Sequence, residues 1–260
     1  MKLDELNNLN TYLYKPAFIT KSRNYIYVLC FSYIRCILKI SYKNCFVIEE
    51  FFNKEKDINL IKSGWDIELL LLCKNQLIIK DKDFNTHSTF KINDEFTIEF
   101  LNISSLRKNI IYVIGKTSKN VMKIYEIKFI NNQLEIINNY IIPYIEEVGG
   151  FTDISKSQFL ISDTKNNKVL SHDIHTGFTF ELCTEGRFGK GKVRKPCEIL
   201  YAKNNAYICD KHNYLLQIFD DKLSFKSQFG GKGRDINSFD LAASITNFSN
   251  NNLLIADMNN

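Results

Sequence analysis

The stretch Ala206-Tyr207-Ile208-Cys209-Asp210, an apolar run that closes on an aspartate, decides the fold of this chain because it recurs at a fixed distance. The same phrase stands 47 residues earlier, as Phe159-Leu160-Ile161-Ser162-Asp163, and 47 residues later, as Leu253-Leu254-Ile255-Ala256-Asp257. A period of this length indicates a chain built from repeated supersecondary units. The sequence therefore predicts a repeat architecture.

The period extends towards the N-terminus with some slippage. The run 111–115 ends on Gly115 where the later phrases end on Asp, and 76–80 and 25–30 have the same apolar character. Each run is followed by a polar turn and a second apolar stretch, such as 215–219. Short strands with frequent turn signals indicate an all-β protein, and units of roughly 40 to 47 residues are typical of propeller blades.

We therefore predict an all-β, six-bladed β-propeller of four-stranded antiparallel blades, forming a single domain over residues 1–260. The expected blades are 16–55, 61–100, 101–145, 148–186, 192–230 and 238–260. The chain ends three residues after Asp257, so the last blade is expected to be incomplete. A strand near 11–14 is expected to close it and to leave an exposed edge, with a truncated reading frame as the alternative.

Composition places the chain in the soluble class. The net charge is +5, which is short of a nucleic-acid footprint, and no apolar run is long enough to span a bilayer. The N-terminus lacks the apolar core of a signal peptide, and the seven cysteines include no Cys-x-x-Cys pair. These features predict a cytoplasmic protein with reduced thiols and no membrane contact.

The C-terminal third resembles the NHL-repeat family of β-propellers. One unit begins at Arg187-Phe188-Gly189-Lys190-Gly191 and runs through Lys195-Pro196 and Asp210 to the strand 215–219; the next begins at Phe229-Gly230-Gly231-Lys232-Gly233 and runs to Asp257. The match is good over 187–260, weaker over 151–186 and only rhythmic over 16–145. The resemblance implies a propeller that presents a binding face, and some propellers similar to this one are lyases or lactone hydrolases.

The motif residues are interpreted as structural. Glycine permits the positive φ angles that a tight crossover between blades requires, and an aspartate after a strand can accept backbone N–H groups in a turn. The alternative is a ring of metal-binding carboxylates in the channel. The residues assigned this structural role are Asp163, Asp210, Asp257, Gly189, Gly191, Gly230, Gly231 and Gly233.

No motif with catalytic or cofactor-binding spacing is found. The glycines of 186–191 lack the spacing of a phosphate-binding loop and precede strands, so a nucleotide site is rejected. His172 and His175 have no third ligand at a fitting spacing and are interpreted as a surface pair between a strand and a turn. We therefore predict no catalytic residue, no metal site and no cofactor.

The most suggestive cluster is basic. In a propeller, the crossover into a blade and the turn after the blade's second strand emerge on the same face, which would gather cations from two neighbouring units. The candidate residues for binding a partner or an anion are Arg187, Lys190, Lys192, Arg194, Lys195, Lys211, His212, Lys232 and Arg234. Such a patch could hold an acidic partner or bind phosphates in a salt-dependent way.

These observations predict a non-enzymatic interaction scaffold that binds a protein through its crossover face. RNA or another polyanion is the first alternative, although base recognition would also need exposed aromatic residues, for which Tyr214 is the only candidate nearby. A metal-dependent hydrolase or lyase centred on the channel is the second alternative. It would require inward-facing histidines or carboxylates from three or more blades. The oligomeric state is not predicted.

Overall fold

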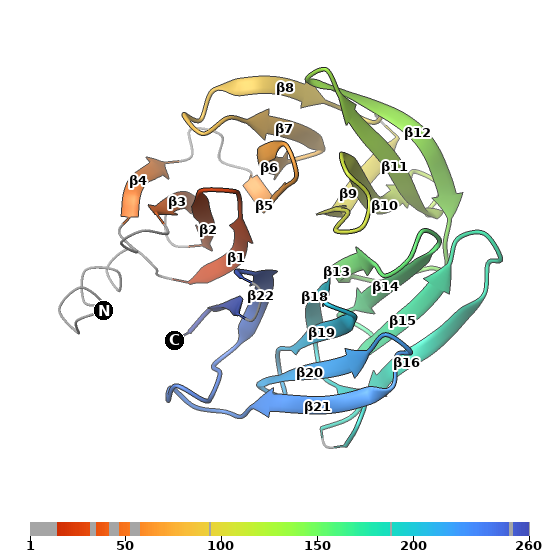
Figure 1. Ribbon diagram of the computed structural model, residues 1–260. Helices are drawn as coiled ribbons and strands as arrows, with labels where there is room; N and C mark the ends of the chain where they lie inside the picture. The colour runs from red at the N-terminus through yellow and green to blue at the C-terminus, as the bar shows by residue number, and fades with distance from the viewer. Residues whose placement is uncertain are drawn as a thin grey trace.

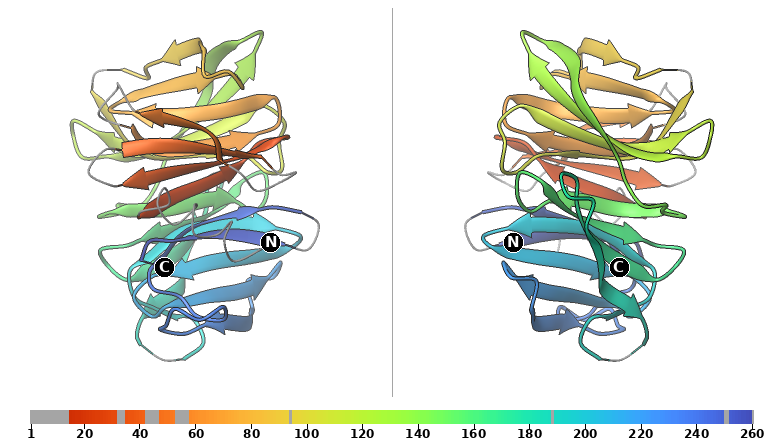
Figure 2. Two further views of the ribbon diagram at one scale, coloured as in Figure 1. Left: turned by 90° about the vertical axis from the view of Figure 1, so that its left-hand side faces the viewer. Right: turned by 90° about the vertical axis from the view of Figure 1, so that its right-hand side faces the viewer.

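The structure is a computed structural model that describes residues 15–31, 35–41, 47–52, 58–93, 95–187, 189–249 and 252–259. These residues form β-strands joined by turns, in small sheets arranged around a common centre (Figure 1). Seen from the side, the sheets stack as the blades of a short, wide body (Figure 2). The protein is therefore a β-propeller, as the sequence predicted.

Each sheet is a meander in which consecutive strands pair, so chain order equals spatial order. The first sheet contains β1 Pro16–Lys21, β2 Tyr25–Phe31, β3 Arg35–Ser41 and β4 Val47–Phe52. The second contains β5 Ile58–Gly64, β6 Ile67–Cys73, β7 Gln76–Lys80 and β8 Thr86–Phe90. The third contains β9 Phe96–Ile103, β10 Ile110–Thr117, β11 Met122–Ile130 and β12 Gln133–Ile141.

The fourth sheet contains β13 Val148–Asp153, β14 Gln158–Asp163, β15 Lys168–Asp173, β16 Thr179–Glu185 and the short β17 Lys192–Val193. The fifth contains β18 Pro196–Ala202, β19 Asn205–Asp210, β20 Leu215–Asp220 and β21 Phe225–Gly230. The last contains β22 Ala242–Asn247 and β23 Leu253–Asp257. The strands of each sheet pair antiparallel, except that β17 runs parallel to β16.

The first strand of each sheet lies innermost. Around the centre, β1, β5, β9, β13, β18 and β22 follow one another, and each contacts its neighbours on both sides, including β22 with β1 (Figure 1). The ring is therefore closed by contact between the two ends of the described chain. One hydrogen bond at this seam runs from Ile19 N to Ser244 Oγ at 3.1 Å.

The structure has five blades rather than the predicted six. Five sheets have four or more strands, whereas β22 and β23 form a sheet of two. The difference arises because, among the described residues, β23 is the one strand that pairs with β22. The strand expected near 11–14 lies outside the described residues and stays a prediction.

The middle strands of the blades are the most apolar because both of their faces are covered by neighbouring blades. In β10, every residue from Ile110 to Gly115 is buried, and β2 is buried from Ile26 to Cys30. Outer strands alternate towards solvent, as in β12, where most side chains are exposed. Packing between blades therefore supplies the core, as expected for stacked sheets that share one hydrophobic interior.

Candidate functional site

The three repeating aspartates hold the crossovers that enter their blades. Asp163 accepts hydrogen bonds from Glu146 N at 3.2 Å and Glu147 N at 3.4 Å. Asp210 accepts one from Arg194 N at 2.8 Å. The sequence predicted that these carboxylates bond backbone N–H groups in the turn that follows, and Asp163 does so with Asn166 N at 3.3 Å.

The third aspartate repeats the arrangement, because Asp257 accepts from Asp240 N at 2.8 Å. In all three blades the bonded N–H lies 16 or 17 residues before the aspartate, on the chain that leads into the innermost strand. The carboxylate therefore ties the entry of each blade to the end of its second strand. This crossover contact was missed by the sequence analysis.

Gly115 occupies the corresponding position in the third blade for a steric reason. A Cβ atom there would lie 2.0 Å from the carbonyl oxygen of Thr97, which belongs to the innermost strand β9. The backbones of β9 and β10 thus approach too closely for any side chain at this position. An aspartate at position 115 would therefore clash with β9 in this backbone.

Asp210 is fully buried, and burial raises the pKa of its carboxyl group from 3.8 to about 6. Hydrogen bonds from Arg194 N, from Asn213 Nδ2 at 2.8 Å and from Gln217 Nε2 at 3.0 Å act in the opposite direction. Desolvation disfavours the charged form more strongly than these donors favour it. The residue is therefore a buried structural acceptor.

The glycine-rich turns have the backbone conformation that the motif predicts at several positions. Gly189, Gly191 and Gly230 have φ angles of +110°, +68° and +106°, which L side chains rarely adopt. A Cβ at Gly230 would also lie 2.6 Å from the ring of Phe239. Gly231 is not among the residues with positive φ, and a Cβ there would meet open space.

Part of the predicted basic cluster comes together on the face where the crossovers enter the blades, which we call the crossover face. His212 N donates to the carbonyl oxygen of Arg194 at 3.0 Å, so the crossover and the turn between β19 and β20 are in direct contact. The pKa of His212 lies below its usual value because of burial first and then the positive charges of Lys211, Arg194 and Lys195.

The next crossover joins the same group. Lys232 Nζ lies 5.4 Å from the ring centre of Tyr214, which belongs to the turn that carries Lys211 and His212. Lys211 Nζ in turn reaches Met258 Sδ at 3.5 Å, in the following blade. We call Arg194, Lys195, Lys211, His212 and Lys232 the basic crossover cluster.

Other predicted members lie elsewhere or have different contacts. Lys190 Nζ lies 5.9 Å from the ring centre of Phe225, at the start of β21. The opposite end of β21 is the one beside the cluster, because its last residue, Gly230, pairs with Leu215. Because β17 runs parallel to β16, with Lys192 beside Thr184, Lys190 lies further back along the blade, away from the cluster. Lys192 Nζ donates to Thr184 Oγ1 at 2.8 Å.

Arg187 and Arg234 are both exposed. Within the described residues, no ion pair involves a cation of the cluster or the side chain of Arg234. The loop that carries Lys232 and Arg234 also presents Ile236, whose side chain is 97% exposed. The crossover face thus combines uncompensated positive charge with an exposed apolar side chain.

The two histidines considered for metal binding do not form a site. His172 is buried in β15 with Nδ1 2.7 Å from Thr179 Oγ1, so its interpretation as a surface residue was wrong. His175 is exposed in the turn after β15, where its backbone N donates to Asp173 Oδ1 at 3.0 Å. Over the described part of the chain, no three His, Cys, Asp or Glu side chains could hold a metal ion together.

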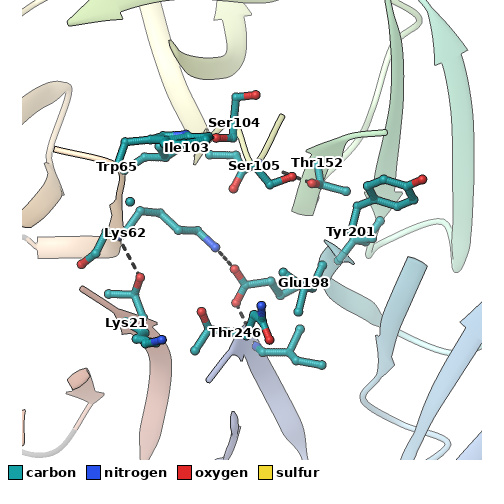
Figure 3. A pocket seen from close by; sticks show the side chains of 18 residues that line it. Lys21, Lys62, Trp65, Ile103, Ser104, Ser105, Thr152, Glu198, Tyr201 and Thr246 are labelled. Atoms are coloured by element: carbon teal, nitrogen blue, oxygen red, sulfur yellow. Dashed lines mark hydrogen bonds and ion pairs between the residues drawn. The ribbon is translucent and has the colours of Figure 1, made fainter. Parts of the chain in front are cut away.

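A cavity of about 240 Å³ opens on the opposite face, which we call the cavity face. It is lined by residues of all six innermost strands and by the turns that follow β5 and β9 (Figure 3). Crossovers enter these strands at their other ends, so the cavity and the basic crossover cluster lie on opposite faces of the ring. No pattern in the sequence predicted this cavity.

An ion pair between Lys62 and Glu198 spans the cavity from β5 to β18, two strands that lie on opposite sides of the ring (Figure 3). Ser244 Oγ donates to Glu198 Oε2, and Ile245 N donates to the same oxygen at 3.3 Å. Burial lowers the pKa of Lys62 to about 7, and a smaller electrostatic effect of Cys209 acts in the opposite direction.

The 47-residue period of the chain relates the positions of Glu198 and Ser244, which lie 46 residues apart. Pro196 pairs with Asp210, and Glu198 lies two residues after Pro196. In the next sheet, Ala242 pairs with Asp257, and Ser244 lies two residues after Ala242. Equivalent positions of neighbouring blades therefore meet at the centre. The partner Lys62 has no such periodic relation, because the early blades lack the motif.

The cavity does not provide the residues that a channel-centred hydrolase or lyase would need. Among the described residues that line it, Glu198 is the one carboxylate, and there is no histidine. Both oxygens of Glu198 are already engaged by Lys62, Ser244 and Ile245. The described lining therefore does not contain histidines or carboxylates from three or more blades.

Together, the fold and its two faces define a β-propeller with a basic crossover face and a polar central cavity. No protein-family model matches the chain, and no curated protein matches it in sequence. None of the segments that the structure describes forms a helix able to cross a membrane.

Two solved structures are similar to it. The crystal structure of a protein of unknown function from Bacteroides caccae matches with a TM-score of 0.67 and 11% identity, over 90% of this chain and 82% of the other. Kuenenia stuttgartiensis hydrazine synthase matches with a TM-score of 0.62 and 10% identity, over 92% of this chain and 82% of the other. At such identities the likeness shows the shared fold alone, because one fold hosts many functions.

Proposed function

We propose that the protein is a non-enzymatic interaction module of the NHL type, which binds an acidic segment of a partner protein on its crossover face. The observation that carries the proposal is the basic crossover cluster, whose cations have no ion-pair partner among the described residues. Uncompensated charge of one sign favours a partner of the other sign and accelerates its association.

The exposed apolar side chains favour a protein over RNA as that partner. Ile236 and Phe229 are both exposed next to the cluster, and apolar side chains at the centre of an interface contribute much of its binding energy. Single-stranded RNA would instead use exposed aromatic faces for stacking. Tyr214 is only partly exposed and lies beneath Lys232, and Phe229 packs edge-on against Phe239.

The proposal is tested with two labelled probes, a short peptide of glutamate and leucine and an oligouridine of equal charge, measured by fluorescence anisotropy. We expect the peptide to bind and its affinity to fall between roughly 50 and 200 mM salt. The double substitution Lys195→Glu with Lys211→Glu should weaken peptide binding about tenfold or more, since it replaces attraction by repulsion at two sites.

The matched control reverses two exposed lysines, Lys156 and Lys222, in turns of the cavity face, and should leave binding unchanged. Ile236→Ser should weaken the peptide and spare the oligouridine. Tighter binding of the oligouridine, unaffected by Ile236→Ser, would replace the proposal with RNA binding. Equal losses in the control and the cluster variant would remove the crossover face from consideration.

We also propose that β22 and β23 are the inner half of a sixth blade. The support is the bond from Asp240 N to Asp257, which repeats the bond from Arg194 N to Asp210 one blade earlier. Deletion of residues 1–15 should lower the cooperativity of thermal unfolding if a strand near 11–14 completes that blade. An unchanged melting curve would argue against it.

A cytoplasmic location belongs to the same proposal. Cys183, Cys197 and Cys209 are free thiols, and burial raises the pKa of Cys183 to about 12, which keeps its thiol protonated and unreactive. Buried, unpaired thiols are typical of reducing compartments. Fractionation of cells that express the tagged protein tests this location.

A further inference from the structure

We propose that the cavity on the cavity face binds a neutral, hydroxyl-rich ligand of monosaccharide size. Nothing in the proposed function uses this cavity, which lies on the other side of the ring from the basic crossover cluster. The inference rests on four observations: the volume, the charge balance, the unoccupied hydrogen-bonding groups and the aromatic residue at the rim.

The volume sets the size of the ligand. Pockets for drug-sized molecules have volumes of roughly 300 to 1,000 Å³, and this cavity is smaller, at about 240 Å³. It is also bounded by all six innermost strands, so a ligand would be surrounded by the ring. A single sugar ring suits this space, whereas a nucleotide or a peptide does not.

The charge balance favours a neutral ligand. Lys62 and Glu198 form an ion pair at the centre of the cavity, and the pair carries no net charge. Lys21 also lines the cavity, where its Nζ donates to the carbonyl oxygen of Phe248 at 2.5 Å. The carboxylate of Glu198 contacts Lys62 and Ser244. An ammonium group has three donors, and Lys62 directs one of them to Glu198. Its remaining donors can serve a hydroxyl or carbonyl oxygen of a ligand.

Neutral donors and acceptors from several blades surround that pair. Thr20, Thr152 and Thr246 each stand four residues after the first paired residue of their strands, so equivalent positions form part of a ring. Asn102 Nδ2 makes only a long contact with Thr152 Oγ1 at 3.5 Å. Ser63 Oγ is buried at the cavity and has no hydrogen-bond partner within the described structure.

A buried hydroxyl without a partner is costly, and a ligand that supplies the missing hydrogen bond removes the cost. The hydroxyls of Thr246, Ser105 and Tyr201 also line the cavity and make no side-chain hydrogen bond with the described residues (Figure 3). Each hydroxyl is both a donor and an acceptor, as the hydroxyls of a sugar are. The lining therefore matches a polyol better than it matches an ion or an apolar ligand.

Trp65 stands at the rim with a side chain that is 49% exposed. It occupies the turn between β5 and β6 with a φ angle of +50°, a conformation uncommon for a bulky residue and usually taken there by Asn, Asp or Gly. Its Nε1 donates to the carbonyl oxygen of Ser104 at 2.6 Å, which holds the ring in place (Figure 3).

A strained, exposed and oriented tryptophan gains little stability from burial, which points to a binding role. The indole face carries negative charge density, and the C–H hydrogens of a sugar ring are weakly positive, so the two surfaces attract. Polar groups at the sides of the cavity and an aromatic face at its rim are complementary to the edges and the flat face of a pyranose.

The experiment uses the intact protein and the fluorescence of Trp65, which is its one tryptophan. Glucose, galactose, mannose and N-acetylglucosamine are titrated, together with glucuronate and galacturonate as charged counterparts, and saturation-transfer NMR checks each contact. We expect at least one neutral sugar to bind at millimolar concentration or below, to shift the Trp65 emission and to bind more tightly than its acid.

Asn102→Ala and Thr246→Val should each weaken that binding about tenfold, the change expected for one lost hydrogen bond. Both variants keep the Lys62–Glu198 pair, so folding is preserved and is verified by circular dichroism. Lys211→Glu, on the crossover face, should leave sugar binding unchanged.

Failure of all the neutral sugars at millimolar concentration would overturn the inference, as would tighter binding of the acids. Binding that neither cavity variant weakens would also overturn it. These outcomes leave the peptide-binding proposal untouched, because that proposal is read out by Lys195 and Lys211 on the other face.

Discussion

Asp210 gives the protein a stability component that changes with pH in a direction unusual for an aspartate. The pKa of its carboxyl group is raised by burial from 3.8 to about 6. A group with a raised pKa in the folded state binds more protons there than in the unfolded state. Its contribution is therefore fully present below pH 3.8 and is lost as the pH rises through about 6.

The size of the effect follows from the two pKa values. Between pH 7 and pH 5, the linkage relation gives a gain of about 1.3 kcal/mol in the free energy of unfolding from this one group. Removal of the carboxyl group removes the gain. Asp210→Asn keeps an oxygen that can accept from Arg194 N, and Asp210→Ala does not, so the two variants differ in stability at pH 7.

The assay is urea denaturation at 25 °C, followed by circular dichroism at pH 7 and pH 5, for the natural protein and both variants. The natural protein should gain about 1.3 kcal/mol over each variant on going from pH 7 to pH 5. The gain over Asp210→Asn should equal the gain over Asp210→Ala, because all other titrating groups are the same in the three proteins. This equality is the control. A difference that stays constant or shrinks at pH 5 would refute the reasoning.

Two further predictions concern stability. Lys62→Met should destabilise the fold by about 3 to 5 kcal/mol because it leaves the buried Glu198 carboxylate without its ion-pair partner, and adding Glu198→Leu should recover much of the loss. Urea denaturation measures the free energy of unfolding of both variants. A double variant that is no more stable than the single variant would contradict this prediction. Gly230→Ala should destabilise by about 1 to 3 kcal/mol, because its φ is +106° and the new Cβ would clash with a neighbouring ring. Gly231→Ala, which meets open space, should change the melting temperature little.

The propeller could be predicted because its strands are set by local patterns. Apolar runs that end at Asp163, Asp210 and Asp257 are the second strands of their blades, and their spacing places each unit. The number of blades was harder to predict from the sequence. It depends on whether further strands pair with β23, which the pattern of a single strand does not show.

The candidate sites were predicted unevenly for a similar reason. Arg194 and His212 could be placed on one face because the turns of a propeller alternate between faces. Lys190 could not, because the parallel return of β17 depends on tertiary pairing. Lys62 and Trp65 lie in blades without the motif, and the side chain of Lys62 crosses the ring to its partner, which no local pattern reveals.

Ser244 links the assembly of the ring to the order in which the chain is made. Its hydroxyl accepts from Ile19 N, 225 residues away in the chain, and donates to Glu198, 46 residues away. A growing chain that has reached Gly230 contains the strands of all five blades but not this hydroxyl. Contacts at such separation form late in folding. Closure of the ring and full satisfaction of the Glu198 carboxylate are therefore one event, so a nascent chain keeps its central charge open to water until β22 is in place.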